Sequence, residues 1–232
     1  QRFTVGVNHV RRTNRSYILG LPFSFTPGEP DGVTRIEGWR FWQEYSHRWE
    51  NQALVLRSTF LDNHTNFAQV AGAPDRRNRI WLGQGHFARR LTDEGLQASV
   101  RASVQRSGDR LSPLDRMALG GAQTVRGFRE NQLIRDQGSV VNFDLDYPVL
   151  RGGGSAPQLS LGVFHDIGHG RNHGESGASM NSTGVTVKGQ WSGWRLDLAL
   201  AIARHFPDGA ARRSDTMQDK GVHFQVSYAF FN

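Results

Sequence analysis

The sequence predicts an all-β protein, an antiparallel transmembrane β-barrel with about ten strands present. Segments long enough to cross a bilayer alternate apolar and polar residues, and the links between them alternate between short and long. No run of about 18 apolar residues occurs, which excludes a membrane-spanning helix. The mean hydropathy of -0.53 is compatible with a barrel, because only every second residue of a barrel strand meets lipid.

The strands predicted in the first half of the chain lie at about 2–10, 35–48, 52–61, 79–91 and 96–104. In the second of these, Trp39 and Phe41 share one face, whereas Arg40 and Glu44 share the other. The charged face is unsuited to a protein core and is typical of a water-filled lumen. The fifth strand alternates apolar and polar residues without a break.

Five further strands are predicted after residue 137, at about 141–147, 159–167, 178–190, 194–203 and 222–230. The last shows the period of two most clearly, because every second residue from Val222 to Phe230 is a large apolar one. In 159–167, Leu161 and Val163 lie on one face and Asp166 on the other. We therefore expect Asp166 to point into the lumen.

The links near 49–51, 92–95, 151–156 and 191–193 are short, while those at 11–34, 62–78, 107–137, 168–177 and 206–219 are long. Transmembrane barrels have short periplasmic turns and long outer loops, which places residue 126 on an outer loop. The ten strands could close on themselves or lack an N-terminal part. Because the chain begins at Gln1 without a signal region, we expect a mature form or an excised piece, and favour the piece.

Composition excludes several classes of function. The chain has no cysteine, so neither a disulfide framework nor a thiolate metal site is available. The net charge of +7 comes almost entirely from arginines, which are scattered among loops and strands. A nucleic-acid-binding face would gather them beside stacking aromatics, so no nucleic-acid partner is expected.

The long link at 107–137 contains the most distinctive segment of the chain. Arg126 lies between Val125 and Gly127, with Phe128 following. If this loop folds inward, Arg126 can reach Asp166 on the barrel wall, and such an ion pair could hold the loop in place. Spacing alone favours the alternative to this ion pair, an exposed loop arginine and an unrelated lumen carboxylate.

Other candidate sites are weaker. The spacing of His165, His169 and His173 gathers side chains on a helix but separates them along a strand, which disfavours a metal site. The run 152–155 lacks the lysine of a phosphate-binding loop and predicts a flexible turn. Asp144 and Asp146 both face inward and are interpreted as lumen charges that pair with arginines. We expect no catalytic residue, metal or cofactor.

Several motifs resemble those of one superfamily of outer-membrane proteins. Gly120-Gly121 with Val125-Arg126-Gly127-Phe128 resembles the inner-loop signature of the superfamily that contains BamA and the two-partner-secretion transporters, and Phe164, Asp166 and Gly168 resemble its wall motif. The greatest similarity is to the FhaC/ShlB/HecB-type secretion transporters and covers nearly the whole chain. It extends through Leu19-Gly20-Leu21-Pro22-Phe23-Ser24-Phe25, Pro27-Gly28, Glu130-Asn131-Gln132-Leu133, Arg135-Asp136 and Gln218-Asp219-Lys220-Gly221.

The resemblance implies a sixteen-stranded barrel of which residues 1–232 form the C-terminal part, with the POTRA domains, the plug helix and the N-terminal strands absent. In that family five strands follow the inner loop, as predicted here. Asn232 departs from the aromatic residue on which family members usually end. The implied site is a loop anchor of Val125, Arg126, Gly127 and Phe128 against a wall partner of Phe164, Asp166 and Gly168.

The function implied is an outer-membrane translocation pore, not an enzyme, that secretes a large partner exoprotein of adhesin or haemolysin type in extended form. We expect it in the bacterial cell outer membrane, in contact with outer-membrane lipid and lipopolysaccharide, and inserted by the barrel-assembly machinery. The alternative on the same fold is a BamA/TamA-like outer-membrane protein assembly factor. A passive porin and a soluble lipocalin-like binder are further alternatives, the second disfavoured by the number of strands.

Overall fold

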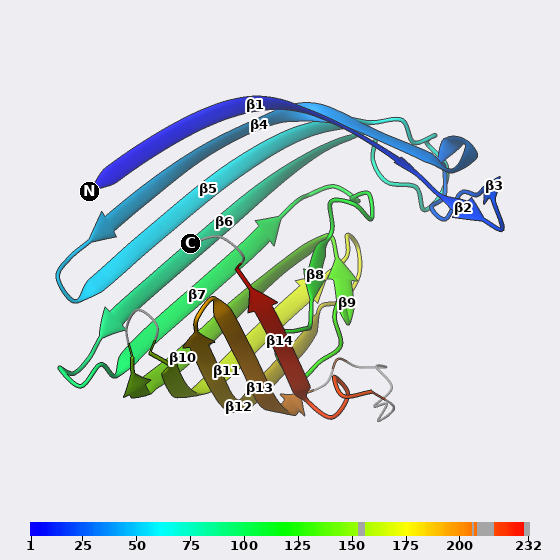
Figure 1. Ribbon diagram of the computed structural model, residues 1–232. Coiled ribbons are helices and arrows are strands. Elements are labelled where there is room, and N and C mark those ends of the chain that lie inside the picture. Colours follow the sequence, from blue (N-terminus) through cyan, green and yellow to red (C-terminus); the bar gives the residue numbers. More distant parts are fainter. Residues whose placement is uncertain (153–155, 206, 208–215, 230–232) are drawn as a thin grey trace.

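The computed structural model describes residues 1–152, 156–205, 207 and 216–229. Within these residues ten long strands form a single antiparallel sheet, in which each strand pairs with the next long strand along the chain (Figure 1). This confirms the predicted all-β architecture and strand number. The strands are β1 (Arg2–Arg15), β4 (Val33–Arg48), β5 (Gln52–Thr65), β6 (Arg77–Arg90), β7 (Gln97–Arg106), β10 (Gln137–Arg151), β11 (Gln158–Arg171), β12 (Ala178–Trp191), β13 (Trp194–His205) and β14 (Val222–Tyr228).

The long links between β1 and β4 and between β7 and β10 contain short secondary-structure elements. A small hairpin of β2 (Tyr17–Ile18) and β3 (Leu21–Pro22) precedes the 3-10 turn η1 (Pro30–Gly32) between β1 and β4. A second hairpin, β8 (Met117–Leu119) with β9 (Leu133–Arg135), lies between β7 and β10. No helix in the described part of the chain has the length and hydropathy needed to cross a membrane.

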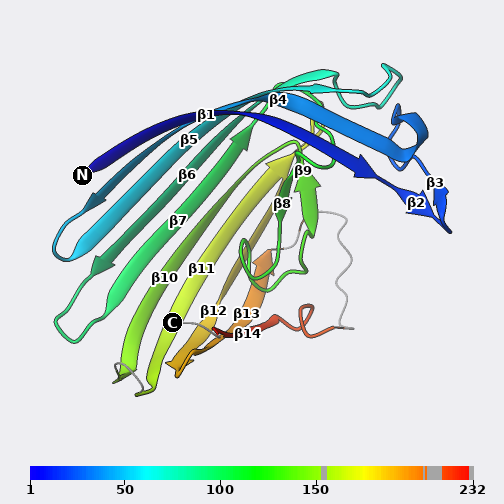
Figure 2. The same ribbon diagram turned by 45° about the horizontal axis from the view of Figure 1, so that its top comes forward.

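The sheet is open. Among the described residues β1 pairs only with β4 and β14 only with β13, so the two end strands do not meet. Figure 2 shows the same curled trough from another side, with the two ends of the sheet apart. The outer edges of β1 and β14 therefore carry backbone groups without a strand partner among the described residues.

The two faces of the sheet differ as the alternation predicts. Leu161, Val163 and Ile167 on β11 point outward and remain 43–51% exposed. Phe164 and Asp166, on the opposite face of the same strand, are buried at 3% and 0%. The face that carries Asp166 is the concave one, over which the link between β7 and β10 folds (Figure 2).

Several strands extend beyond their predicted ends. β1 continues to Arg15 rather than residue 10, and β11 continues to Arg171, so the link predicted at 168–177 is only 172–177. Gly168 and Gly170 fell within that predicted link, yet both pair within the β10–β11 ladder. At the chain end, β14 stops at Tyr228, and Phe230 to Asn232 lie outside the described residues, as do 153–155 of the predicted flexible turn.

Candidate functional site

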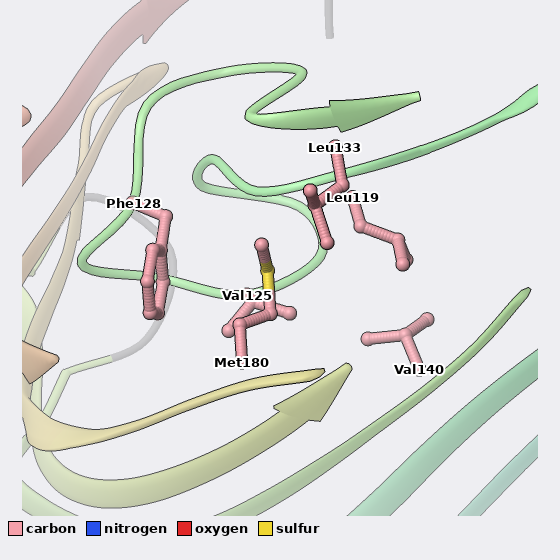
Figure 3. Packing of buried hydrophobic residues seen from close by; sticks show 6 residues of the cluster. All are labelled: Leu119, Val125, Phe128, Leu133, Val140 and Met180. Atoms are coloured by element: carbon pink, nitrogen blue, oxygen red, sulfur yellow. The ribbon is translucent and has the colours of Figure 1, made fainter. Parts of the chain in front are cut away.

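The link between β7 and β10, residues 107–136, is here called the inner loop because it packs on the concave face of the sheet. Its hairpin pairs Met117 with Arg135 and Leu119 with Leu133. Apolar side chains hold it against the wall: Leu119 and Val125 are fully buried beside Met180 of β12. Figure 3 shows this cluster, which consists of Leu119, Val125, Phe128, Leu133, Val140 and Met180.

Glycines shape the tip of the inner loop. Gly120, Gly121 and Gly127 have φ values of +105°, +101° and +89°, a region that residues with a Cβ rarely adopt. A Cβ on Gly121 would overlap the Glu130 carboxylate, whose Oε1 accepts the N–H of Ala122 at 2.8 Å. These residues therefore let the chain reverse tightly enough to present residues 125–128 to the wall.

Arg126 is 5% exposed and lies at the centre of a network of ion pairs. Its guanidinium forms a bidentate pair with Asp166, from Nε to Oδ2 and from Nη2 to Oδ1, both at 2.7 Å. Nη1 donates to Asp144 Oδ1 at 2.7 Å, and the Arg126 backbone N–H donates to Asp166 Oδ2 at 2.9 Å. The guanidinium carbon lies 3.7 Å from the centre of the Phe164 ring, so the ring also contributes a cation–π contact.

The charges around Arg126 are nearly balanced. Arg101 of β7 lies 3.9 Å from Asp144 Oδ2 and supplies a second cation for the two carboxylates. The Asn142 amide donates to Asp166 Oδ1 at 2.8 Å and to the carbonyl of Thr124 at 2.5 Å. Such pairing and hydrogen bonding offset the cost of removing these groups from water.

Two wall glycines explain how closely the tip approaches. A Cβ on Gly168 would lie 2.7 Å from Val125 Cγ2, well inside van der Waals contact. Gly170 sits in the same way against Arg135 of the hairpin, at 2.9 Å from Cγ. The loop also needs a glycine where it meets the sheet, because a Cβ on Gly127 would lie 2.9 Å from the Ala201 Cβ of β13.

The base of the inner loop is tied to its surroundings by Asp136, which is fully buried. Its Oδ1 accepts Arg116 Nε at 2.9 Å and the Leu111 N–H at 3.1 Å, both from the start of the loop. Its Oδ2 accepts the His173 N–H at 2.9 Å, from the β11–β12 link. A single carboxylate thus joins the two ends of the loop to the neighbouring link.

A further contact fixes the outer flank of the tip. Arg129 forms a bidentate pair with Asp219 of the β13–β14 link, with Nη2 at 2.5 Å from Oδ2. The Arg129 guanidinium holds the pKa of Asp219 well below its usual range. The adjacent Glu130 N–H donates to Gln218 Oε1 at 3.3 Å.

The structure brings all the predicted site residues together. Val125 and Phe128 are buried in the cluster of Figure 3, Arg126 contacts both Asp166 and Phe164, and Gly168 faces Val125. Arg126 is therefore an interior residue, and the exposed alternative left open by its spacing does not occur. Asp146, the other inward carboxylate of β10, pairs instead with Lys188 at 2.8 Å.

Sequence reasoning missed three partners. It assigned Asp144 to the lumen without linking it to Arg126, and it did not consider Asn142 or His223. His223 Nε2 accepts the Gly127 N–H at 2.9 Å, so the neutral ring carries its proton on Nδ1. Asn142 could have been found by aligning the two neighbouring strands, because it is the direct register partner of Asp166.

The three spaced histidines do not converge. His165 and His169 bond Thr183 and Ser179 on β12, at 2.9 and 3.0 Å, and His173 belongs to the link that Asp136 holds. Among the residues that the structure describes, no group of three or more His, Cys, Asp or Glu side chains is placed to hold a metal ion.

Comparison with known proteins identifies the family of the chain. Residues 43–190, more than half of the chain, match the family described as haemolysin secretion/activation protein ShlB/FhaC/HecB. The chain belongs to this family. As a ShlB/FhaC/HecB-family chain, it corresponds to the C-terminal barrel portion of a two-partner-secretion transporter. A search among curated proteins finds no match.

Two solved structures share the fold of this ShlB/FhaC/HecB-family chain. CdiB from Escherichia coli superposes with a TM-score of 0.74 at 15% sequence identity, covering 97% of this chain and 41% of that one. CdiB from Acinetobacter baumannii superposes with a TM-score of 0.68 at 15% identity, covering 97% of this chain and 37% of that one. The chain thus spans about two fifths of the length of these proteins.

Proposed function

We propose that this chain forms part of a pore in the Gram-negative outer membrane that secretes a large partner exoprotein of adhesin or haemolysin type. Family membership and the open curled sheet support this function. The observation that carries it is the inner loop, whose Arg126 is bound to Asp166 and Asp144 on the lumen wall. The ion pair acts as an anchor that positions the loop in the path of the cargo.

The lumen beside the anchor suits an extended polypeptide. A cavity of about 380 Å³ adjoins Arg126 and is lined by polar side chains such as Ser99, Asp146, Lys188 and Asp197. An extended chain has unpaired backbone groups, and polar walls and strand edges can bond to them transiently. Because the inner loop narrows this space, passage of a chain requires the loop to shift, without nucleotide hydrolysis.

The anchor suits a loop that must be held and released. Asp166 accepts bonds from the Arg126 backbone, its guanidinium and Asn142, so removing the Arg126 side chain leaves a buried carboxylate without its two guanidinium bonds. Breaking a buried pair in this way costs about 3–5 kcal/mol, far more than the net worth of a surface pair at about 1 kcal/mol or less. Loss of Arg126 therefore frees the tip.

The remaining parts of the proposal concern the complete transporter. It carries additional N-terminal strands, a plug helix and POTRA domains that recognise the cargo, and residues 1–232 serve as the C-terminal part of its barrel. It contacts outer-membrane lipid and lipopolysaccharide, and the barrel-assembly machinery inserts it. It acts without a cofactor and catalyses no reaction.

The test is Arg126→Ala in the full-length transporter, coexpressed with its exoprotein. We expect secreted exoprotein to fall by at least about tenfold, since the lost anchor is worth several kcal/mol. Heat-modifiable migration of the barrel on gels should remain. Arg135→Ala is the matched control, because its guanidinium donates to the carbonyl of neighbouring Ile134 and it lies in the same loop.

Wild-type secretion by Arg126→Ala would refute the anchor role. The two alternative functions predict other outcomes. Depletion of an assembly factor would lower many outer-membrane proteins rather than one exported partner. A passive porin in proteoliposomes would admit solutes at a rate that the partner exoprotein does not alter.

A further inference from the structure

An aromatic row crosses the outward face of the sheet toward its long-loop end. Phe41, Phe60 and Trp81 are direct register partners on β4, β5 and β6. Phe41 and Phe60 are 44% and 49% exposed, and Trp39, one row nearer the loops, is 60% exposed. Together with Val7 of β1 they line a pocket of about 480 Å³. Aromatic girdles of this kind mark the interface of the bilayer in outer-membrane barrels.

Two arginines border the same pocket. Arg106 of β7 is the register partner of Trp81, and Arg79 is the partner of Asp62, directly above the aromatic row. The Arg79 side chain is 73% exposed, with Nε 4.0 Å from Asp62 Oδ1. In the described part of the chain Arg106 is exposed and its side chain makes no hydrogen bond or ion pair.

The carboxylates near the pocket already have partners. Asp62 is held by Arg77 in a bidentate pair at 3.0 and 2.6 Å. Asp109 accepts the backbone N–H of Arg79 at 2.8 Å. Level with the aromatic row and above it, the outward positions of β1 and β4–β7 carry an excess of arginine. These are Arg11, Arg15, Arg35, Arg77, Arg79 and Arg106, against Glu37 and Asp62.

We propose that this pocket binds a phosphorylated lipid of the outer leaflet, the lipid A part of lipopolysaccharide. The inference rests on the proposed function, because it takes the outward face to meet lipid and the long-loop end to lie at the cell surface. The acyl chains pack on Trp39, Phe41 and Phe60, and the lipid phosphate is bound by Arg79 and Arg106. Guanidinium groups match phosphate oxygens with paired N–H donors, which favours this ligand over a neutral lipid.

The position of the arginines fits a headgroup better than a second polypeptide. They adjoin the aromatic row at the level where a bilayer changes from hydrocarbon to headgroups. The pocket reaches from the end strand β1 to β7, but both arginines lie on the interior strands β6 and β7, away from the open edges. An added strand would pair with β1 or β14 and would not cover this surface. Basic residues at such an interface attract anionic lipid by about 1 kcal/mol each, the equivalent of about fivefold in affinity.

The experiment measures retention of diphosphoryl lipid A by the full-length transporter in detergent, by native mass spectrometry. The variant Arg79→Gln/Arg106→Gln should bind it about 30-fold more weakly than the wild type. Arg89→Gln is the matched control, because Arg89 lies on the same outward face of β6 at the short-turn end. It should bind like the wild type.

A second arm changes the ligand and keeps the wild-type protein, so it does not depend on folding of a variant. Phosphatidylcholine should bind more weakly than diphosphoryl lipid A, and about 1 M salt should weaken binding of lipid A. Equal binding of the neutral lipid, or equal binding by the double variant, overturns the proposal. Secretion of the exoprotein is measured separately, so the two proposals can be refuted independently. Lipid A binding could prove absent while Arg126→Ala still blocks secretion, or lipid A could bind as expected while Arg126→Ala secretes normally.

Discussion

Replacing Asp166 by asparagine tests the anchor without changing its shape. Asp166 accepts bonds from the Arg126 N–H, Nε and Nη2 and from the Asn142 amide. An asparagine keeps one acceptor oxygen, but its NH₂ group is itself a donor and cannot accept the hydrogen bonds that the second carboxylate oxygen accepted. The bidentate pair is lost and Arg126 keeps Asp144 as its remaining charged partner. We expect a cost of about 3 kcal/mol in holding the tip, which corresponds to about a 150-fold larger fraction of released loop.

Limited trypsin digestion can measure this release. The bond between Arg126 and Gly127 is buried, so cleavage after Arg126 requires the tip to leave the wall. When opening is fast relative to cleavage, the rate follows the released fraction. In the detergent-solubilised full-length transporter, mass spectrometry should detect the peptide that ends at Arg126 accumulating on the order of 100-fold faster in Asp166→Asn.

Asp146→Asn is the control for this experiment. Asp146 lies on the same face of the sheet, but it pairs with Lys188 of β12 rather than with the inner loop. Cleavage after Arg126 should stay at the wild-type rate in this variant. The same slow cleavage in Asp166→Asn would show that the pair with Arg126 does not hold the loop, and the reasoning would fail.

Two other predictions concern the wall and the outer flank. Gly168→Ala adds a Cβ 2.7 Å from Val125 Cγ2. Overpacking of this kind costs about 1–3 kcal/mol and should speed tryptic cleavage after Arg126 by about 5- to 150-fold. Val125→Ala in the same chain should restore protection, and no rescue would contradict the steric explanation. Because Arg129 lowers the pKa of Asp219, the stability that this carboxylate adds is present above its unfolded pKa of about 3.9 and is lost as the pH falls through the lowered value. The Tm difference between wild type and Asp219→Asn, followed by tryptophan fluorescence, should therefore persist down to about pH 4 and shrink below it; a difference that vanishes near pH 6 would exclude this origin.

Local patterns in the sequence predicted where the strands lie, but they predicted the residues at which the strands end less accurately. A regular period of two located five of the ten long strands, and a less regular alternation indicated the other five, because alternate residues meet different solvents on the two faces of a sheet. Gly168 and Gly170 fell within the link predicted at 168–177, although glycine in a strand can also mark a close approach of another backbone. The structure shows that they are small because the inner loop presses on them, a long-range reason that no local window contains.

The sequence by itself determined the alternating faces, the number of strands, the position of the inner loop and the residues of its tip. Only the tertiary structure decided that β1 and β14 do not pair among the described residues. It also decided that Arg126 is shared by Asp166 and Asp144, with further bonds to this site from Asn142 and His223. Alternation follows from each residue's own preference for water or lipid, which is encoded position by position. The partners of one buried guanidinium depend on strand register and on glycines that admit the loop, and these link residues up to 96 positions apart.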